Sequence, residues 1–309
     1  MSESGRGASG VVWSVTPAHQ VAPRWPDVPP WSMTTTAPTL ALSGGTRMPQ
    51  IALGTWPLDD EQAEKAILSA IEVGYRHVDT AENYENERGV GRALAACGMP
   101  RADLFVTTKI NAQWHGVAEA AEGLERNLER LGLDYVDLLL LHWPNPARDR
   151  YVHGWEGLIA LREQGRARAI GVSNFKPKHL QRIMTETGVT PEVNQIERHP
   201  YLIRSAAVAF HAQHGIVTEG WSPLGRDNGL FEDPVVAGIA AEVGRSASQV
   251  LLRWAVQQGH AVAVKSKSRE RQAENLAVFD FSLTSGQIAD LNSLDSGEHK
   301  AVDSDVFGH

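Results

Sequence analysis

The stretch that decides the fold is YVDLLLLHWPNPARDRYVHGWEGLIALREQGRARAIGVS, residues 135–173. Its two ends, YVDLLLLH (135–142) and RARAIGVS (166–173), are short runs in which apolar residues predominate, as in strands that are covered on both faces. Residues 154–164 between them predict a helix. Because a helix that connects two strands returns the chain to the same end of the sheet, we expect these strands to be parallel.

The same alternation of strand and helix runs through the chain from Thr39 onward. In DDEQAEKAILSAIEVG (59–74), an Asp precedes a stripe of apolar residues and a Gly follows it, which is typical of a helix. The predicted strands are IALGT (51–55), YRHVDT (75–80), LFVTTKI (104–110), YVDLLLLH, RARAIGVS, PEVNQ (191–195), GIVTEGW (215–221) and AVAVK (261–265), and the other predicted helices cover 85–98, 118–131, 154–164, 177–187, 204–213, 246–258 and 269–277. This pattern predicts an α/β fold of the (β/α)8 TIM-barrel type.

Three segments lie outside the repeat. LALSG (40–44) and MPQIAL (48–53) predict an N-terminal β-hairpin across one end of the barrel, and TSGQIADLNSL (284–294) predicts an extra C-terminal helix. Residues 1–38 are rich in Gly, Ser and Pro and have no apolar face, so they predict a disordered extension ahead of one barrel domain, residues 39–309. This composition fits a start codon assigned too early, with Met33 as the native first residue.

The composition excludes several classes of function. The chain has 29 Lys and Arg against 37 Asp and Glu, a net charge of −8, so its field repels nucleic acid and anionic membranes. No apolar run reaches the roughly 18 residues of a membrane span. The only cysteine is Cys97, which excludes a disulfide framework and a cysteine-cluster metal site. We expect a cytoplasmic protein without a metal that acts on a small molecule.

Polar residues stand where the predicted strands end. Asp79, Lys109 and His142 end three successive strands, and Tyr84 follows Asp79 in the next loop. The loops after the strands of such a barrel converge on one mouth, so we expect these four residues in one pocket. A neighbouring cation lowers the pKa of a tyrosine. Lys109 can be that cation, held and kept charged by Asp79, while His142 offers a ring N–H; together they could polarise a carbonyl and protonate the developing alkoxide.

Motifs in order along the chain resemble the signatures of the aldo-keto reductases. They are VDTAENYENE (78–87), TTKI (107–110), LLLLHWP (138–144), GVSNF (171–175), EVNQIERHP (192–200), GWSPLG (220–225) and VKSKSRERQAENLAVFDF (264–281). Residues 151–175 look similar to the bacterial 2,5-diketo-D-gluconic acid reductase branch. The resemblance implies a monomeric, NADPH-dependent oxidoreductase that reduces aldehydes or ketones, such as keto-sugar acids or dicarbonyls, to alcohols. It implies Tyr84 as general acid, Asp79 and Lys109 tuning it, and His142 orienting the carbonyl.

The resemblance also implies the cofactor site. Its members would be Gly54, Thr55, Ser173, Asn174, Gln195, Trp221, Ser222, Leu224, Lys265, Ser266, Arg271 and Asn275. Ser173, Asn174 and Gln195 would bind the nicotinamide carboxamide, and Trp221 would stack on its ring. The residues themselves favour NADPH over NADH, because Lys265, Lys267, Arg269 and Arg271 form a basic patch at the start of a predicted helix, where a phosphate binds well.

The substrate pocket is less well defined by the sequence. Trp56, Trp114 and Trp143 each follow a predicted strand and are expected to line an apolar wall beside His142. The chain also departs from the family pattern: Val264 stands in place of Pro, Ser268 in place of Arg, Glu85 in place of the Gly after the tyrosine, and Asn111 in place of an aromatic residue.

Three other interpretations stay open from the sequence. Asp79 and Lys109 could form a purely structural ion pair between neighbouring strands. Lys109 could instead form a Schiff base, as in an aldolase-like lyase, although Asp79 opposes this by keeping the amine protonated. The chain could also be a cofactor-binding sensor that keeps the fold without useful turnover.

Overall fold

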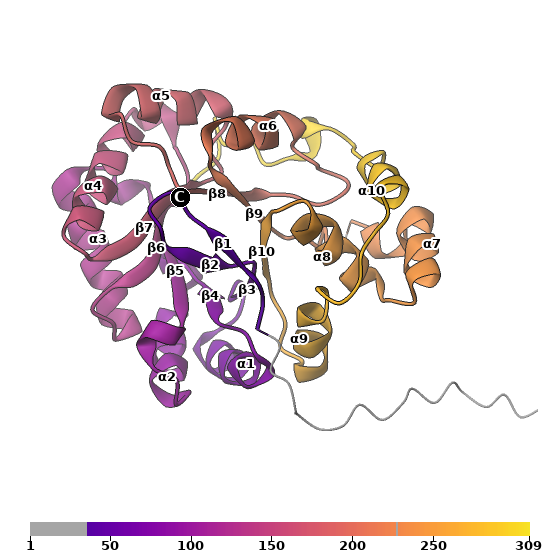
Figure 1. Ribbon diagram of the computed structural model, residues 1–309. Helices are drawn as coiled ribbons and strands as arrows, with labels where there is room; N and C mark the ends of the chain where they lie inside the picture. The colour runs from indigo at the N-terminus through magenta and orange to yellow at the C-terminus, as the bar shows by residue number, and fades with distance from the viewer. Residues whose placement is uncertain (1–35, 227) are drawn as a thin grey trace, which may run out of the picture. The chain divides into compact units, whose positions relative to one another are not determined.

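Eight parallel strands form a closed barrel in the computed structural model, which describes residues 36–226 and 228–309 (Figure 1). Around the barrel the strands follow the order β10, β3, β4, β5, β6, β7, β8, β9. Their bounds are β3 (Ile51–Gly54), β4 (His77–Asp79), β5 (Phe105–Ile110), β6 (Val136–Leu141), β7 (Ala167–Ser173), β8 (Val193–Glu197), β9 (Val217–Trp221) and β10 (Ala261–Val264). Each predicted strand is observed, and the predicted TIM barrel is confirmed.

Helices cover the outside of the barrel and connect its strands (Figure 1). They are α1 (Asp60–Val73), α2 (Glu87–Ala96), α3 (Val117–Leu131), α4 (Tyr151–Glu163), α5 (Pro177–Thr187), α6 (Ser205–His214), α7 (Pro234–Val243), α8 (Ala247–Gln257), α9 (Arg269–Leu276) and α10 (Ser285–Asn292). α1 illustrates the local code: the Asp59 side chain accepts a hydrogen bond from the Gln62 N–H at its start, and Gly74 ends it. The predicted C-terminal helix is α10.

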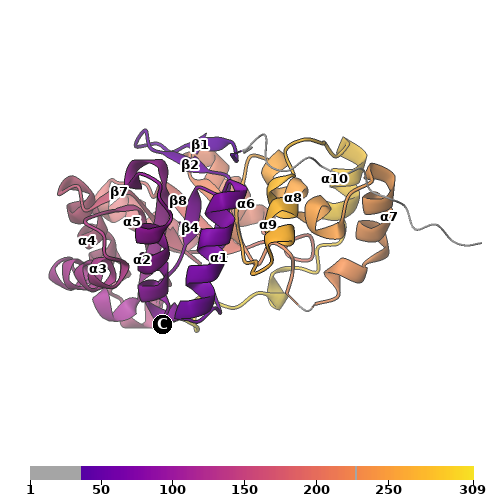
Figure 2. The ribbon, with the colours of Figure 1, turned by 90° about the horizontal axis from the view of Figure 1, so that it is seen from below.

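The predicted hairpin is also confirmed. β1 (Thr39–Ala41) pairs antiparallel with β2 (Arg47–Pro49). Leu42 and Met48 of the hairpin pack with Phe105, Leu138 and other apolar residues inside the barrel, so the hairpin closes the end where the strands begin. Figure 2 shows the hairpin on one side of the barrel and the chain end on the other. The mouth at the carboxyl ends of the strands is thereby left as the polar end.

The structure corrects three helix predictions. α7 was missed, because its sequence PVVAGIAAEV has small apolar residues all round and no polar face, although Asp233, Pro234 and Gly244 mark its two ends. α4 begins at Tyr151, three residues before the predicted start. The predicted helix 85–98 begins at Glu87, because a 3-10 turn, η1 (Glu82–Tyr84), precedes it.

Most of the apolar core lies between the barrel and its helices, with large side chains such as Trp155 and Trp254 fully buried. Within the described residues, none of the helices is long and apolar enough to cross a membrane alone. Only α7 and α8 taken together have the length and composition of a membrane span, and they are bent by 88° at their junction. The predicted extension, including Met33, lies outside the described residues up to residue 35.

Candidate active site

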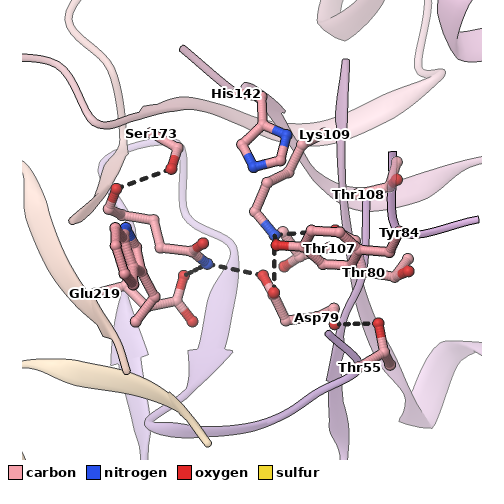
Figure 3. A network of polar contacts seen from close by, with 12 residues as sticks. Thr55, Asp79, Thr80, Tyr84, Thr107, Thr108, Lys109, His142, Ser173 and Glu219 are labelled. Carbon is pink, nitrogen blue, oxygen red and sulfur yellow. Dashed lines mark hydrogen bonds and ion pairs between the residues drawn. The ribbon is translucent and has the colours of Figure 1, made fainter. Parts of the chain in front are cut away.

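The ends of β4 and β5 bring three of the predicted residues together (Figure 3). The Lys109 ammonium is fully buried and donates hydrogen bonds to Asp79 Oδ1 at 2.8 Å, to the Thr80 carbonyl at 3.0 Å and to the Tyr84 hydroxyl at 3.3 Å. Tyr84 reaches the ammonium from η1, and Glu85 turns the chain away with a φ of 56°. This left-handed conformation explains why the family that the motifs resemble commonly has a glycine at the position of Glu85.

The protonation of this group follows from burial and charge together. Burial lowers the pKa of Lys109, but the Asp79 carboxylate and Tyr84 raise it, and the net direction is upward. Burial raises the pKa of Tyr84, the Lys109 ammonium lowers it, and the net direction is again upward. The predicted lowering of the Tyr84 pKa is therefore correct for the Lys109 contribution and wrong for the net shift, because desolvation of the phenolate outweighs the cation.

His142 follows β6, and its ring lies beside Tyr84. Its ring packs edge-on to Tyr84, with 5.9 Å between ring centroids, and its Nδ1 lies 3.2 Å from Asn111 Oδ1. Burial and the Lys109 charge hold the pKa of His142 well below its usual value, so the imidazole is neutral. If Asn111 Oδ1 accepts from Nδ1–H, then Nε2 is an acceptor. His142 can donate a ring N–H to a substrate carbonyl, as predicted, only from Nε2. This requires the Asn111 amide to be flipped, so that its Nδ2 donates to the His142 Nδ1.

Gln195 connects the ion pair to a residue that the strand ends did not reveal. Its Nε2 donates to Asp79 Oδ2 at 2.7 Å and to Glu219 Oε2 at 2.9 Å. Glu219 is fully buried within β9. A signal for it existed: Glu219 stands two residues before Trp221, so the period of two of a strand puts an acid on the same face as a predicted site residue.

The predicted nicotinamide residues are tied to one another. Ser173 Oγ donates to the Gln195 carbonyl at 2.9 Å, and Asn174 Nδ2 donates to the His142 carbonyl at 3.1 Å. The Trp221 indole N–H donates to Asn174 Oδ1 at 2.9 Å. These side chains therefore stand in fixed orientations beside His142, which is what a flat ring and its carboxamide would need.

Two further predicted residues lie beside β4. The Thr55 hydroxyl is fully buried and donates to the Asp79 carbonyl at 3.1 Å, so it supports the strand end. A Cβ on Gly54 would lie 3.7 Å from the Lys265 backbone N, in ordinary van der Waals contact. On the loop after β9, Ser222 has a φ of 48° and Leu224 packs on the core.

Cations gather at the start of α9. Ser268 caps this helix by accepting from the Arg271 N–H. Lys265, Lys267 and Arg271 are exposed and form no ion pair within the described part of the chain, whereas Arg269 pairs with Glu72. Ser266 and Asn275 are buried below them. Unpaired cations at a capped helix start suit a phosphate group, so these residues fit the 2′-phosphate of NADPH.

The three tryptophans lie in different surroundings. Trp56 is 53% exposed, whereas Trp143 is 6% exposed and packs edge-on to Phe307 at 4.9 Å between ring centroids. Trp114 does not face the same wall: its ring packs against Gly123 of α3 and its indole N–H donates to Glu82 at 2.8 Å. The prediction grouped Trp114 with Trp56 and Trp143 because it used only their positions just after a predicted strand.

The last residues of the chain fold over the mouth. The His309 ring lies 5.8 Å from the His142 ring, and the Ala112 N–H donates to the His309 carbonyl at 2.7 Å. Asp305 fixes this tail through Lys176 at 2.7 Å and the His179 ring at 2.9 Å. The sequence EHKAVDSDVFGH (298–309) suggests a loop that folds over the mouth, and the structure agrees. Phe307 and His309 add to the wall beside Trp143 and His142, a detail that the sequence did not predict.

Comparisons with known proteins agree with the observed fold. The family model described as "Aldo/keto reductase family" matches residues 50–296. The chain is 44% identical over 271 residues to methylglyoxal reductase DkgA of Salmonella typhimurium, covering 87% of this chain and 98% of that protein. An aldo/keto reductase structure from Brucella melitensis superposes with a TM-score of 0.81 at 42% identity, covering 84% of this chain and 100% of that one.

A third relative adds a ligand. The Bombyx mori aldo-keto reductase in complex with NADP superposes with a TM-score of 0.78 at 34% identity, covering 84% of this chain and 93% of that one. Matches of this extent define the class: the chain belongs to the aldo/keto reductase family. Within it, the chain is similar to the DkgA methylglyoxal reductases.

Proposed function

We propose that this protein reduces small-molecule aldehydes or ketones to alcohols with NADPH, and that Tyr84 supplies the proton. The observation that carries the proposal is the 3.3 Å contact between the Tyr84 hydroxyl and an ammonium that Asp79 holds at 2.8 Å. A hydroxyl that is already hydrogen-bonded to a fixed cation can give up its proton, because the cation stabilises the phenolate that forms.

The proton transfer follows from these residues. Bound NADPH supplies a hydride to the carbonyl carbon. As negative charge develops on the carbonyl oxygen, the Tyr84 O–H bond breaks and its proton goes to that oxygen. The electron pair stays on the phenolate, beside Lys109. The raised pKa of Tyr84 does not oppose this step, because an alkoxide is a far stronger base than a phenolate. His142 orients the carbonyl in the Nε2–H tautomer.

The cofactor preference rests on charge. Lys265, Lys267 and Arg271 can pair with a 2′-phosphate, which NADH lacks, and the similar Bombyx mori protein was crystallised with NADP. The substrate class rests on the apolar rings of Trp143 and Phe307 beside His142, with the exposed Trp56 as a further aromatic residue just after β3. Apolar rings beside a polar centre suit small dicarbonyls and keto-sugar acids. The similar Salmonella protein is named a methylglyoxal reductase.

Two alternatives are disfavoured by specific contacts. A Schiff base requires a neutral amine, but Asp79 and Tyr84 raise the pKa of Lys109. A pure sensor would need no hydroxyl at the ammonium. A panel of carbonyl substrates, assayed by the loss of NADPH absorbance, tests the proposal: turnover is expected with several of them. Borohydride trapping of a covalent adduct on Lys109, or NADPH binding without any turnover, would contradict it.

A further inference from the structure

Glu219 lies inside the barrel one side chain away from the Asp79–Lys109 pair. It stands on β9, fully buried, in register with Gln195 of β8 and Ala261 of β10. The Gln195 amide donates from Nε2 to both carboxyl groups, to Asp79 at 2.7 Å and to Glu219 at 2.9 Å. Figure 3 shows this chain of contacts, which continues through Asp79 to Lys109 and the Tyr84 hydroxyl.

The charges of this cluster balance only if one carboxyl group is protonated. Within the described part of the chain, two carboxylates would face a single cation, Lys109. The neighbours of Glu219 on β8 and β10 are an amide and an alanine. On β4, burial lowers the pKa of His77 to about 4, so that ring is neutral. Because an uncompensated buried charge is strongly unfavourable, one carboxyl group keeps its proton at neutral pH.

The contacts decide which carboxyl group that is. Asp79 touches the ammonium at 2.8 Å, so its ionised form is stabilised. Glu219 has no cation in contact, and its Oε1 has no hydrogen-bond partner among the described residues. Burial and the Asp79 charge raise the pKa of Glu219 to about 8, in agreement with this assignment. When Glu219 does ionise, its charge raises the pKa of Tyr84.

We propose that Glu219 is a positioning residue that holds a proton at neutral pH and, acting with Gln195 and Asp79, makes Tyr84 harder to ionise once that proton has left. This rests on the proposed carbonyl reduction, in which Tyr84 must carry its proton. Release of the Glu219 proton in alkaline solution then keeps the Tyr84 hydroxyl protonated to higher pH and extends the range over which reduction proceeds.

An infrared titration tests the proton itself. The variant is Glu219→Gln, which keeps an oxygen that can accept from Gln195. The control is Glu192→Gln, a buried carboxyl group just before β8 that accepts from the Gly44 N–H at 2.9 Å, at the opposite end of the barrel. We expect the wild type and the control to show a protonated-carboxyl stretch that disappears in alkaline solution, and Glu219→Gln to lack it. An unchanged band in Glu219→Gln, or none in the wild type, would overturn the assignment.

A pH profile tests the effect on Tyr84. In Glu219→Gln we expect the alkaline limb of kcat for NADPH-dependent reduction to move to lower pH by about half a unit or more, and the control to coincide with the wild type. Coincident profiles for all three proteins would refute the coupling.

The proposed function can fail separately, since a wild type that consumes no NADPH contradicts it and leaves the infrared result intact. Phenolate absorbance then replaces the kinetics. With Glu219 present, the titration of Tyr84 is the difference in absorbance between the wild type and Tyr84→Phe. Without Glu219, it is the difference between Glu219→Gln and the double variant Glu219→Gln/Tyr84→Phe. Superimposed difference curves would overturn the proposal, and a shift to lower pH without Glu219 would support it.

Discussion

Replacement of Tyr84 by Phe removes one oxygen atom and separates catalysis from structure. The Lys109 ammonium has three acceptors: Asp79, the Thr80 carbonyl and the Tyr84 hydroxyl. The variant removes only the longest of these contacts, at 3.3 Å. The buried ion pair keeps its two shorter hydrogen bonds. Because the lost bond to the ammonium is long, we expect the free energy of unfolding to fall by about 1.5 kcal/mol, the lower end of the range for hydrogen bonds to charged groups.

The expected loss of activity is much larger. A positioned general acid contributes about a hundredfold to ten-thousandfold to the rate, which corresponds to roughly 3–5 kcal/mol in the activation free energy. Tyr84→Phe should lower kcat for carbonyl reduction by this amount. The dissociation constant for NADPH should stay within about twofold, because in the proposed reaction the hydroxyl meets the reacting oxygen and not the adenosine end of the cofactor. Stopped-flow single turnovers and fluorescence titration measure the two quantities.

Tyr135→Phe is the matched control. Tyr135 lies just before β6, at the opposite end of the barrel from the mouth, with Arg101 and Arg168 over its ring at 4.3 Å and 4.7 Å. This variant should reduce carbonyl substrates at the wild-type rate. If Tyr84→Phe also turns over at the wild-type rate, the assignment of the proton donor is incorrect. If the free energy of unfolding of Tyr84→Phe falls by several kcal/mol, then Asp79 and the Thr80 carbonyl alone do not hold the Lys109 ammonium as argued.

Three other changes have defined outcomes. Arg271→Ala should raise the KM for NADPH more than the KM for NADH, in steady-state assays with each cofactor; equal increases would place the phosphate elsewhere. Asn111→Asp leaves only acceptors beside His142 Nδ1. It should therefore fix the Nδ1–H tautomer of His142 and lower kcat by about tenfold or more. An unchanged kcat would show that His142 donates no Nε2–H to the carbonyl. Glu219→Gln should remove a pH dependence of stability. The pKa of Glu219 is raised to about 8 in the folded protein, so above its ordinary value only the folded state keeps the proton. Relative to the variant, the free energy of unfolding of the wild type then falls with rising pH by about 1.4 kcal/mol per pH unit, up to about pH 8. Urea unfolding at several pH values measures this, and parallel plots of stability against pH for the two proteins would contradict it.

The sequence was sufficient for the barrel and for the approach of Asp79, Tyr84 and Lys109. Strand runs of mostly apolar residues, separated by capped amphipathic helices, leave few arrangements other than parallel strands around a closed core. Once the strands are parallel, residues at their ends share one rim, so the topology brings these side chains together. α7 was missed because it lacks the polar face that marks a surface helix.

Long-range packing decided the rest. The position of the tail over His142 depends on Asp305 meeting Lys176 and His179, contacts between residues more than a hundred positions apart. The net upward shift of the Tyr84 pKa depends on how completely its surroundings exclude water, which residue types alone do not determine. Glu219 could be located on the inner face of β9 from its spacing. The proton that we propose for it depends on the absence of a second cation within reach among the described residues, and only the folded barrel sets that distance.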